Sequence, residues 1–506
     1  MKSWMEGYNS DVEYISGYYK ELSPEFINLC AISSNVQSID TTKEFIYCEL
    51  GCGQGFSSLV NATMYPHATF YAVDYNPTHI AHARLIAEEA GLNNIIFLEN
   101  SFQDLVDNPN ILPMCDYIVF HGIYTWVNDI NRENLVKICN RHLKSGGFVY
   151  NSYNAKPGWL SIEPIQQLMW RFSQEYNGNT MQKVDSIIEI IEEMNNTKVG
   201  YFKEFETYTN ARIKKIKEGD KHYVVHEYLH ESWKAFYFTD VAEHMEKAKL
   251  TFLTSADPTI NYVENLFPEK IKNVLNKISD DNNRELFKDM LFVKMFRKDI
   301  YVRGIIRKLD IFEKYEWFKN KKWFYMKNEI PEKFKFILSN SEIIGDKKVY
   351  FPIAKMLKER VVTTEELLKK TKLKVPDLIQ ALLMLYTNSF IALYNENRNN
   401  NANKLNKVII KYALNKNNFQ NIIMPYTYTI TKLGLLDSLF LFALFKGYNK
   451  LDTIVNYIYN LLNSRGMSID FNGKKLKDKE LKIKLFEFGK KWQNNTYKLY
   501  KDTGVL

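Results

Sequence analysis

The stretch that most restricts the fold of this chain is YCELGCGQG, residues Tyr47–Gly55. A short apolar strand leads through Glu49 directly into three glycines at alternate positions. Glycine lets a backbone turn tightly and approach a bound molecule closely. The spacing G-x-G-x-G differs from the dinucleotide pattern G-x-G-x-x-G, whose turn faces a pyrophosphate. The turn therefore predicts a site for a ligand without phosphates.

Strands and helices continue to alternate after this turn. Apolar runs predict four further strands, at residues 69–74, 94–98, 116–121 and 146–153, with helical segments between them. Alternation of this kind is typical of right-handed βαβ units and a parallel sheet. We therefore expect an α/β fold with a Rossmann-like sheet. A helix–strand pair at 239–258 and a strand at 300–304 are expected to complete it.

The pattern divides the 506 residues into several units. Residues 352–394 predict three helices and a strand, as in a winged-helix unit, and the asparagine-rich run 395–406 predicts a loop. The expected units are an N-terminal lid (1–45), a core (46–159), a helical insert (160–233), a segment that completes the core (234–305), a middle domain with the winged-helix-like unit (306–400) and a C-terminal helical domain (401–506).

Composition favours a cytoplasmic protein. Five cysteines are scattered without a C-x-x-C pair, and the first residues lack the apolar core of a signal peptide. The longest apolar run, Leu433–Phe445, is too short for a membrane span, so we expect a buried helix and no membrane insertion. The net charge of +8 is a mild excess, expected mainly from a lysine-rich surface.

Polar residues stand at the predicted strand ends. Asp74 closes the second strand, and a carboxylate about 20 residues beyond the glycine turn is placed to accept both hydroxyls of a ribose. Asn100 and Ser101 follow the third strand, where an amide oxygen and a backbone N–H can contact an adenine edge. Together these positions predict a nucleoside ligand with an amino-acid tail.

ELGCGQG, AVDYNP and LENSFQDL resemble the motifs of class I S-adenosylmethionine (AdoMet)-dependent methyltransferases. The resemblance implies AdoMet as cofactor, with the glycine loop around its methionine part and Asp74 on its ribose. Asn100 stands where many members carry aspartate. The expected cofactor-binding residues are Tyr19, Glu49, Gly51, Gly53, Gly55, Asp74, Asn100, Ser101 and His121.

GYYKELSP, HGIYTWV, YNAKPGW, HEYLHESWKAFYFTDV and FRKDIYVRG resemble bacterial methyltransferases with an appended methyltransferase regulatory domain. Rickettsial enzymes that methylate lysines of a large outer-membrane surface protein belong to this group. The resemblance implies an AdoMet-binding core at 46–159, a regulatory segment at 234–305 and a protein substrate methylated on lysine. It also implies that Tyr18 and Tyr19 close over the cofactor.

The insert is the expected site of self-association. Its apolar face exceeds what one surface helix needs, so we expect a homodimer. The residues of that face are Ile187, Ile188, Ile190 and Ile191.

Methyl transfer from a sulfonium is a direct displacement, which needs alignment and exclusion of water but no metal. An acceptor lysine must first lose a proton, and a hydrophobic pocket beside a positive sulfonium lowers its pKa. Amino-methylating relatives often carry Asn/Asp-Pro-Pro-Tyr where this chain has HGIY (His121–Tyr124). The resemblance implies that Tyr124 flanks the acceptor nitrogen. His121 is expected to orient the acceptor through its carbonyl or to act as a base. An aromatic channel for the alkylammonium is expected from Trp126, Tyr153 and Trp159.

HEYLH (His226–His230) matches the H-E-x-x-H pattern of zinc proteases. No third ligand follows at the required distance, so we predict no metal. Instead we expect a helix that begins at His226, with Leu229, Trp233, Phe236 and Phe238 packed and with Glu227 and Tyr228 at the substrate entrance.

Two alternatives remain open. The basic-aromatic run FKNKKWFYMK (Phe318–Lys327) and the winged-helix-like unit slightly favour amino-methylation of nucleic acid, although we expect no nucleic-acid partner. A regulator that binds AdoMet without turnover is the other alternative.

Overall fold

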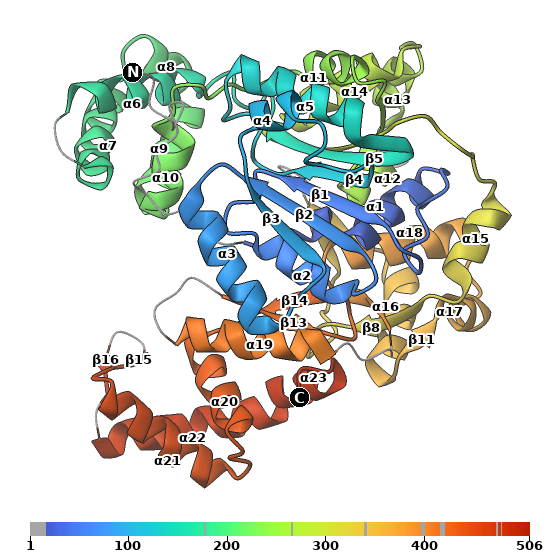
Figure 1. Cartoon of the computed structure of the whole chain (residues 1–506). Helices are drawn as coiled ribbons and strands as arrows, with labels where there is room; N and C mark the ends of the chain where they lie inside the picture. Colours follow the sequence, from blue (N-terminus) through green and yellow to red (C-terminus); the bar gives the residue numbers. More distant parts are fainter. Residues whose placement is uncertain are drawn as a thin grey trace.

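The computed structural model describes residues 17–176, 179–264, 267–337, 342–395, 400–414, 420–471, 474–476 and 478–506. The first part of the expected lid, residues 1–16, lies outside the described residues. A central sheet occupies the middle of the molecule with helices on both faces (Figure 1). The helical insert stands beside one end of this sheet, and the C-terminal helices lie below it in the same view.

Seven strands form the central sheet in the order β3-β2-β1-β4-β5-β7-β6, which confirms the predicted Rossmann-like α/β fold. Strands β1 to β5 pair in parallel, whereas β7 runs antiparallel to both β5 and β6. Because the order reverses between β1 and β4, a crevice opens at the carboxyl ends of these strands. The strand bounds are β1 (Ile46–Leu50), β2 (Thr69–Asp74), β3 (Ile95–Glu99), β4 (Cys115–Phe120), β5 (Leu143–Asn154), β6 (Thr251–Ser255) and β7 (Phe296–Val302).

Alternate residues of β1 enter different cores. Tyr47 packs into the apolar cluster on one face of the sheet, and Cys48 and Leu50 pack into the cluster on the other. All three side chains are buried, as expected for a parallel strand covered on both faces. This double burial fixes the end of β1, and with it the glycine turn that follows.

Helices around the sheet begin and end at the predicted signals. The Ser23 hydroxyl accepts a hydrogen bond from Phe26 N–H at 3.2 Å, which caps α1 (Pro24–Ser33). α3 (Pro77–Ala90) starts with proline and ends at Gly91, whose φ is 65°. The other helices here are η1 (Lys20–Leu22), α2 (Phe56–Met64), α4 (Phe102–Asp107), α5 (Asp129–His142), α11 (Phe238–Glu246), α12 (Pro258–Val263), α13 (Glu269–Leu275) and α14 (Asp281–Phe292).

The insert forms its own helical core. Its helices are α6 (Glu163–Glu175), α7 (Thr180–Asn196), α8 (Tyr201–Glu204), α9 (Glu206–Glu218) and α10 (Lys221–Tyr228). Ile187, Ile188 and Ile191 of α7 are buried in a cluster with residues of α6, α9 and α10. The apolar face that suggested a homodimer is therefore largely covered within the same chain, and the homodimer itself stays a prediction.

The middle domain contains the predicted winged-helix-like order. The segment 352–394, expected to form three helices and a strand, contains α16 (Lys347–Glu359), α17 (Thr364–Thr371), α18 (Val375–Thr387) and β12 (Ile391–Tyr394). β12 and β11 (Val362–Thr363) flank β8 (Lys322–Tyr325) in an antiparallel sheet. The domain also contains α15 (Ile311–Lys319), β9 (Lys335–Ile337) and β10 (Glu342–Ile344).

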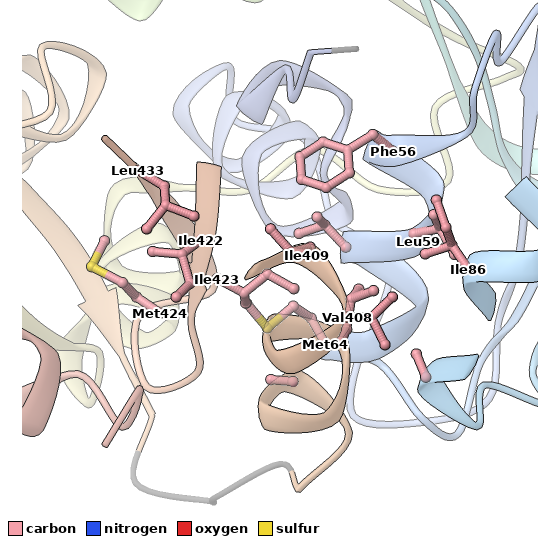
Figure 2. Close-up of a cluster of buried hydrophobic side chains, with 14 of the residues drawn as sticks. Phe56, Leu59, Met64, Ile86, Val408, Ile409, Ile422, Ile423, Met424 and Leu433 are labelled. Carbon is pink, nitrogen blue, oxygen red and sulfur yellow. The ribbon is translucent and has the colours of Figure 1, made fainter. Parts of the chain in front are cut away.

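The C-terminal domain packs directly on the core. The loop predicted for the asparagine-rich run is wrong from Asn400 onward, because α19 (Asn400–Ala413) begins there; residues 396–399 lie outside the described residues. Val408 and Ile409 of α19 belong to one buried cluster with Met64 of α2 and Ile86 of α3, and α19 contacts both of these helices (Figure 2). This nonlocal burial stabilises a helix that its composition disfavours.

Further elements complete this domain, including α20, the buried helix expected at 433–445. No helix within the described ranges combines the length and the apolar character that a membrane crossing needs. The element bounds are β13 (Asn421–Met424), β14 (Thr429–Lys432), α20 (Leu435–Phe445), α21 (Leu451–Ser464), β15 (Asp470–Phe471), β16 (Lys474–Lys475), α22 (Asp478–Asn494) and α23 (Thr496–Asp502).

Candidate active site

A cavity opens at the carboxyl ends of β1, β2, β3 and β4, where the sheet order predicts a ligand crevice. The N-terminal segment at Gly17–Tyr19 borders one part of it, and α10 of the insert borders another. The structure thus brings together residues from four strand ends and two distant segments. The residues expected to bind the ligand that line the cavity are Tyr19, Glu49, Gly51, Gly53, Asp74, Asn100, Ser101, His121 and Trp126.

The glycine turn has positive φ angles of 72° at Gly51 and 54° at Gly53, which favour glycine. Backbone N–H groups of Gly51 and Cys52 both donate to Val73 O, at 2.8 and 2.9 Å. A Cβ atom on Gly53 would meet no atom within 4 Å, so the turn is open there. Gly55 does not line the cavity: a Cβ on it would lie 2.5 Å from the Phe97 ring, so this glycine allows α2 to pack on β3.

Asp74 connects the turn to the second strand. Its carboxylate accepts hydrogen bonds from Gly53 N–H at 2.8 Å and Asn76 N–H at 2.9 Å, and His79 Nδ1 lies 3.3 Å away. The residue is 8% exposed and lines the cavity. A carboxylate has about four lone-pair positions, so Asp74 retains capacity for the hydroxyl groups of a ligand.

The loop after β3 differs in one detail from the expectation. Ser101 N–H, expected to contact an adenine, donates to Asp104 Oδ2 at 2.8 Å instead. Ser101 Oγ accepts from Asp104 N–H at 3.1 Å, which completes the capping box of α4. Asn100 lines the cavity beside it and remains the candidate for that contact.

Glu49 is a buried acid in the cavity wall. It is 5% exposed, and its carboxyl group accepts a short hydrogen bond from the Ser58 hydroxyl. Burial raises the pKa of Glu49 to about 7, and the negative charge of Asp74 acts in the same direction. Without a bound cation, this carboxyl is therefore close to half ionised at neutral pH.

The rings of His121 and Tyr19 lie against each other just beyond the carboxyl end of β4. Their ring centroids lie 3.8 Å apart. Tyr19 N–H donates to Ser57 Oγ at 3.3 Å, which holds the N-terminal segment against α2. His121 Nδ1 lies 2.9 Å from the Tyr150 hydroxyl, and burial lowers the pKa of His121 to about 4. The imidazole is thus neutral at pH 7. Tyr18 and Tyr19 both pack against the apolar core, but Tyr18 does not line the cavity.

Three of the aromatic residues expected at the acceptor lie elsewhere. Tyr124 points into the core, where its hydroxyl lies 2.5 Å from His244 Nδ1. Tyr153 donates to Asp299 Oδ2 at 2.6 Å, and Trp159 packs on Trp233 with centroids 4.7 Å apart. None of the three lines the cavity. Tyr124 follows β4, Tyr153 lies in the last part of β5, and Trp159 follows β5. Tertiary packing sets the orientation of all three side chains and places them in the cores.

α10 supplies a part of the wall that the sequence only partly indicated. Tyr223, His226, Glu227 and His230 all line the cavity, and the last three are buried. HEYLH does not begin a helix as predicted, because α10 ends at Tyr228 and His230 lies beyond it. The described residues contain no group of three His, Cys, Asp or Glu side chains arranged to hold a metal. In the sequence, the HEYLH motif was the feature that indicated a functional role for this segment.

Apart from its histidines, the ionisable side chains of the cavity are carboxyl groups, tyrosines and one cysteine. Its described lining contains the carboxyl groups of Glu49, Asp74 and Glu227 but no lysine or arginine. Such a wall favours cationic ligands and disfavours phosphates. Trp126 and Tyr223 add aromatic surface to it.

Comparisons with known proteins agree with this geometry. Residues 48–147 match a family described as a methyltransferase domain, and residues 220–303 match one described as a predicted methyltransferase regulatory domain. An uncharacterised protein of Synechocystis sp. is 33% identical over 483 residues, which cover 94% of each chain. An uncharacterised protein of Rickettsia prowazekii is 28% identical over 332 residues, which cover 64% of this chain and 57% of that protein.

One solved structure shares the whole fold. PKMT2 from Rickettsia typhi, solved in complex with AdoHcy, superposes with a TM-score of 0.73 at 20% sequence identity. The superposition covers 96% of this chain and 99% of that one, so the middle and C-terminal domains are part of the shared architecture.

Proposed function

Because this chain belongs to the class I AdoMet-dependent methyltransferases that carry a methyltransferase regulatory domain, we propose that it N-methylates lysine side chains of a protein. AdoMet is the methyl donor of this family. When bound, it supplies an electrophilic methyl group on a positively charged sulfur.

The residues of the cavity fit AdoMet. Gly53 presents an open backbone, and Asp74 retains acceptor capacity for ribose hydroxyls. Asn100 stands at the end of the neighbouring strand for the adenine. Tyr19, over His121, covers the site and excludes water from it. These residues bind and orient, which is what a displacement reaction requires of a protein.

One observation carries the choice of an amine acceptor: the cavity wall holds three carboxyl groups and no lysine or arginine among the described lining residues. An alkylammonium ion is attracted by these groups and by the faces of Trp126 and Tyr223. A nucleic acid would bring phosphates to the same wall, where carboxylates repel them.

A nucleic-acid substrate is further disfavoured by the middle domain. Phe318, Trp323 and Tyr325 of the basic-aromatic run are buried in its apolar core. Aromatic side chains that stack on bases must be accessible. The resemblance that suggests lysine as acceptor also suggests an outer-membrane surface protein as the first substrate to test.

Radiolabel from methyl-tritiated AdoMet tests the proposal. The protein is incubated with a recombinant outer-membrane surface protein or with total RNA, and labelled residues are identified after hydrolysis. We expect label in methyllysine, abolished in Asp74→Ala. Label in carboxyl groups or nucleotides would reject lysine as acceptor. AdoHcy binding without label in either substrate would favour the regulator without turnover.

A further inference from the structure

The buried carboxyl group of Glu227 has a position that cofactor binding does not explain. It is 3% exposed and lines the cavity from α10. Its Oε1 atom accepts a hydrogen bond from Asn154 Nδ2 at 2.6 Å and another from Trp233 Nε1 at 3.2 Å. Asn154 ends β5, so the carboxyl group is held between the sheet and the segment after α10.

The two fixed donors engage one oxygen of this carboxyl. The second oxygen, Oε2, therefore retains capacity to bind a cation or to take up a proton. The phenol of Tyr223 also hydrogen-bonds the carboxyl, and this tyrosine is 49% exposed. Glu227 is thus rigidly placed on one side and open to a ligand on the other.

We propose that Glu227 binds the ε-ammonium group of the acceptor lysine and takes its proton before methyl transfer. This inference rests on the function proposed above and assigns to HEYLH the role of acceptor site. In the step, one N–H bond of the ammonium breaks and an O–H bond forms at Oε2. The nitrogen keeps the electron pair, which makes it a nucleophile.

The surroundings of Glu227 suit a proton acceptor. Burial raises its pKa to about 7, although the hydrogen bonds of Asn154, Trp233 and Tyr223 and the charge of Arg212 act in the opposite direction. The Arg212 guanidinium lies over the Trp159 ring at 4.6 Å and donates to the Tyr228 hydroxyl at 3.1 Å. It is therefore held by other partners rather than paired with Glu227.

The second histidine of the motif, His230, adds little positive charge. Burial lowers the pKa of His230 to about 4, so its ring is neutral at pH 7. His226 is 5% exposed beside it. A general base is most effective when its pKa lies near the working pH. Burial in the same cavity lowers the pKa of the acceptor amine from its ordinary value of about 10.4 towards that pH.

Proton release on amine binding tests the site without turnover. N-acetyl-lysine methylamide is titrated into the AdoHcy-saturated protein by calorimetry in two buffers of different ionisation enthalpy. A group with a pKa near 7 that becomes ionised beside the ammonium releases about half a proton at pH 7 and almost none at pH 9. We expect this pattern for the wild type and for Glu231→Gln, whose exposed carboxyl is four residues away. For Glu227→Gln we expect clearly less proton release at pH 7 than for the wild type, with any remainder coming from Glu49, whose pKa is also about 7.

The pH profile of methyl transfer separates proton acceptance from a structural role. We expect Glu227→Gln to be slower by about 100-fold to 10,000-fold at pH 7 and then to gain about tenfold per pH unit, while the wild-type rate levels off above pH 7. An equal loss at every pH, or proton release at pH 7 that is as large in Glu227→Gln as in the wild type, would overturn the assignment. If the wild type neither binds nor methylates the amine, the proposed function fails as well. If the wild type methylates lysine and Glu227→Gln does so at the same rate, only the role of Glu227 is rejected.

Discussion

Replacing Glu49 with glutamine should stabilise the ligand-free protein at alkaline pH. Burial raises the pKa of this carboxyl from its ordinary value of 4.5 to about 7. A carboxyl with a higher pKa in the folded state binds its proton more tightly there. Its contribution to stability is fully present below pH 4.5 and is lost as the pH rises through about 7.

The structure sets the size of this effect. One pKa unit corresponds to about 1.4 kcal/mol, so the rise from 4.5 to about 7 amounts to about 3 kcal/mol at pH 8. Glutamine keeps a carbonyl oxygen that can accept the Ser58 hydroxyl and has no charge to desolvate. We therefore expect Glu49→Gln to exceed the wild type by about 1 to 3 kcal/mol at pH 8 and by less than about 1 kcal/mol at pH 5.

Urea unfolding at the two pH values measures this difference. Glu88→Gln is the matched control, because Glu88 is exposed on α3 and its charge is solvated in both states. It should differ from the wild type by less than about 0.5 kcal/mol at either pH. A Glu49→Gln protein that is less stable than the wild type at pH 8, or equally shifted at pH 5 and pH 8, would refute the reasoning.

Four further predictions follow from the site and the packing. Asp74→Ala should weaken AdoHcy binding by about 10- to 100-fold in calorimetry, because a charged acceptor contributes about 1.5–3 kcal/mol; an unchanged dissociation constant would contradict its ribose role. Ile409→Ala should lower the free energy of unfolding by about 2–4 kcal/mol, since this side chain is 1% exposed between α19 and the core, whereas Lys404→Ala on the exposed face should change little. EDTA should leave the rate of methyl transfer unchanged. If EDTA abolished activity and zinc restored it, HEYLH would have to be considered a zinc-binding motif. Light scattering should give twice the chain mass of 59.7 kDa if the insert mediates a homodimer, and a single chain mass would end that expectation.

Local sequence patterns predicted which strand-end residues meet at the edge of the sheet. The glycine turn, Asp74 and Asn100 follow consecutive strands, and parallel strands bring their carboxyl ends to one edge of the sheet. The positions of these residues depend on backbone geometry within a few residues of each strand end. Sequence spacing is therefore enough to place them together.

The acceptor half was not predictable in the same way. Tyr124 and Tyr153 follow or end strands, but their rings point into apolar cores, where they pack against Phe236 and where the Tyr124 hydroxyl contacts His244 of α11. Glu227 reaches the cavity from an inserted helix more than 70 residues beyond β5. No local sequence pattern predicts a contact between segments this far apart in the chain.

The sequence alone therefore determined the α/β sheet and the glycine turn at the end of its first strand, since these depend on short-range periodicity and backbone geometry. Only the tertiary structure decided which aromatic rings line the cavity, why an asparagine-rich segment is helical and where HEYLH lies. Each of these outcomes results from packing between segments far apart in the chain, where burial outweighs local preference.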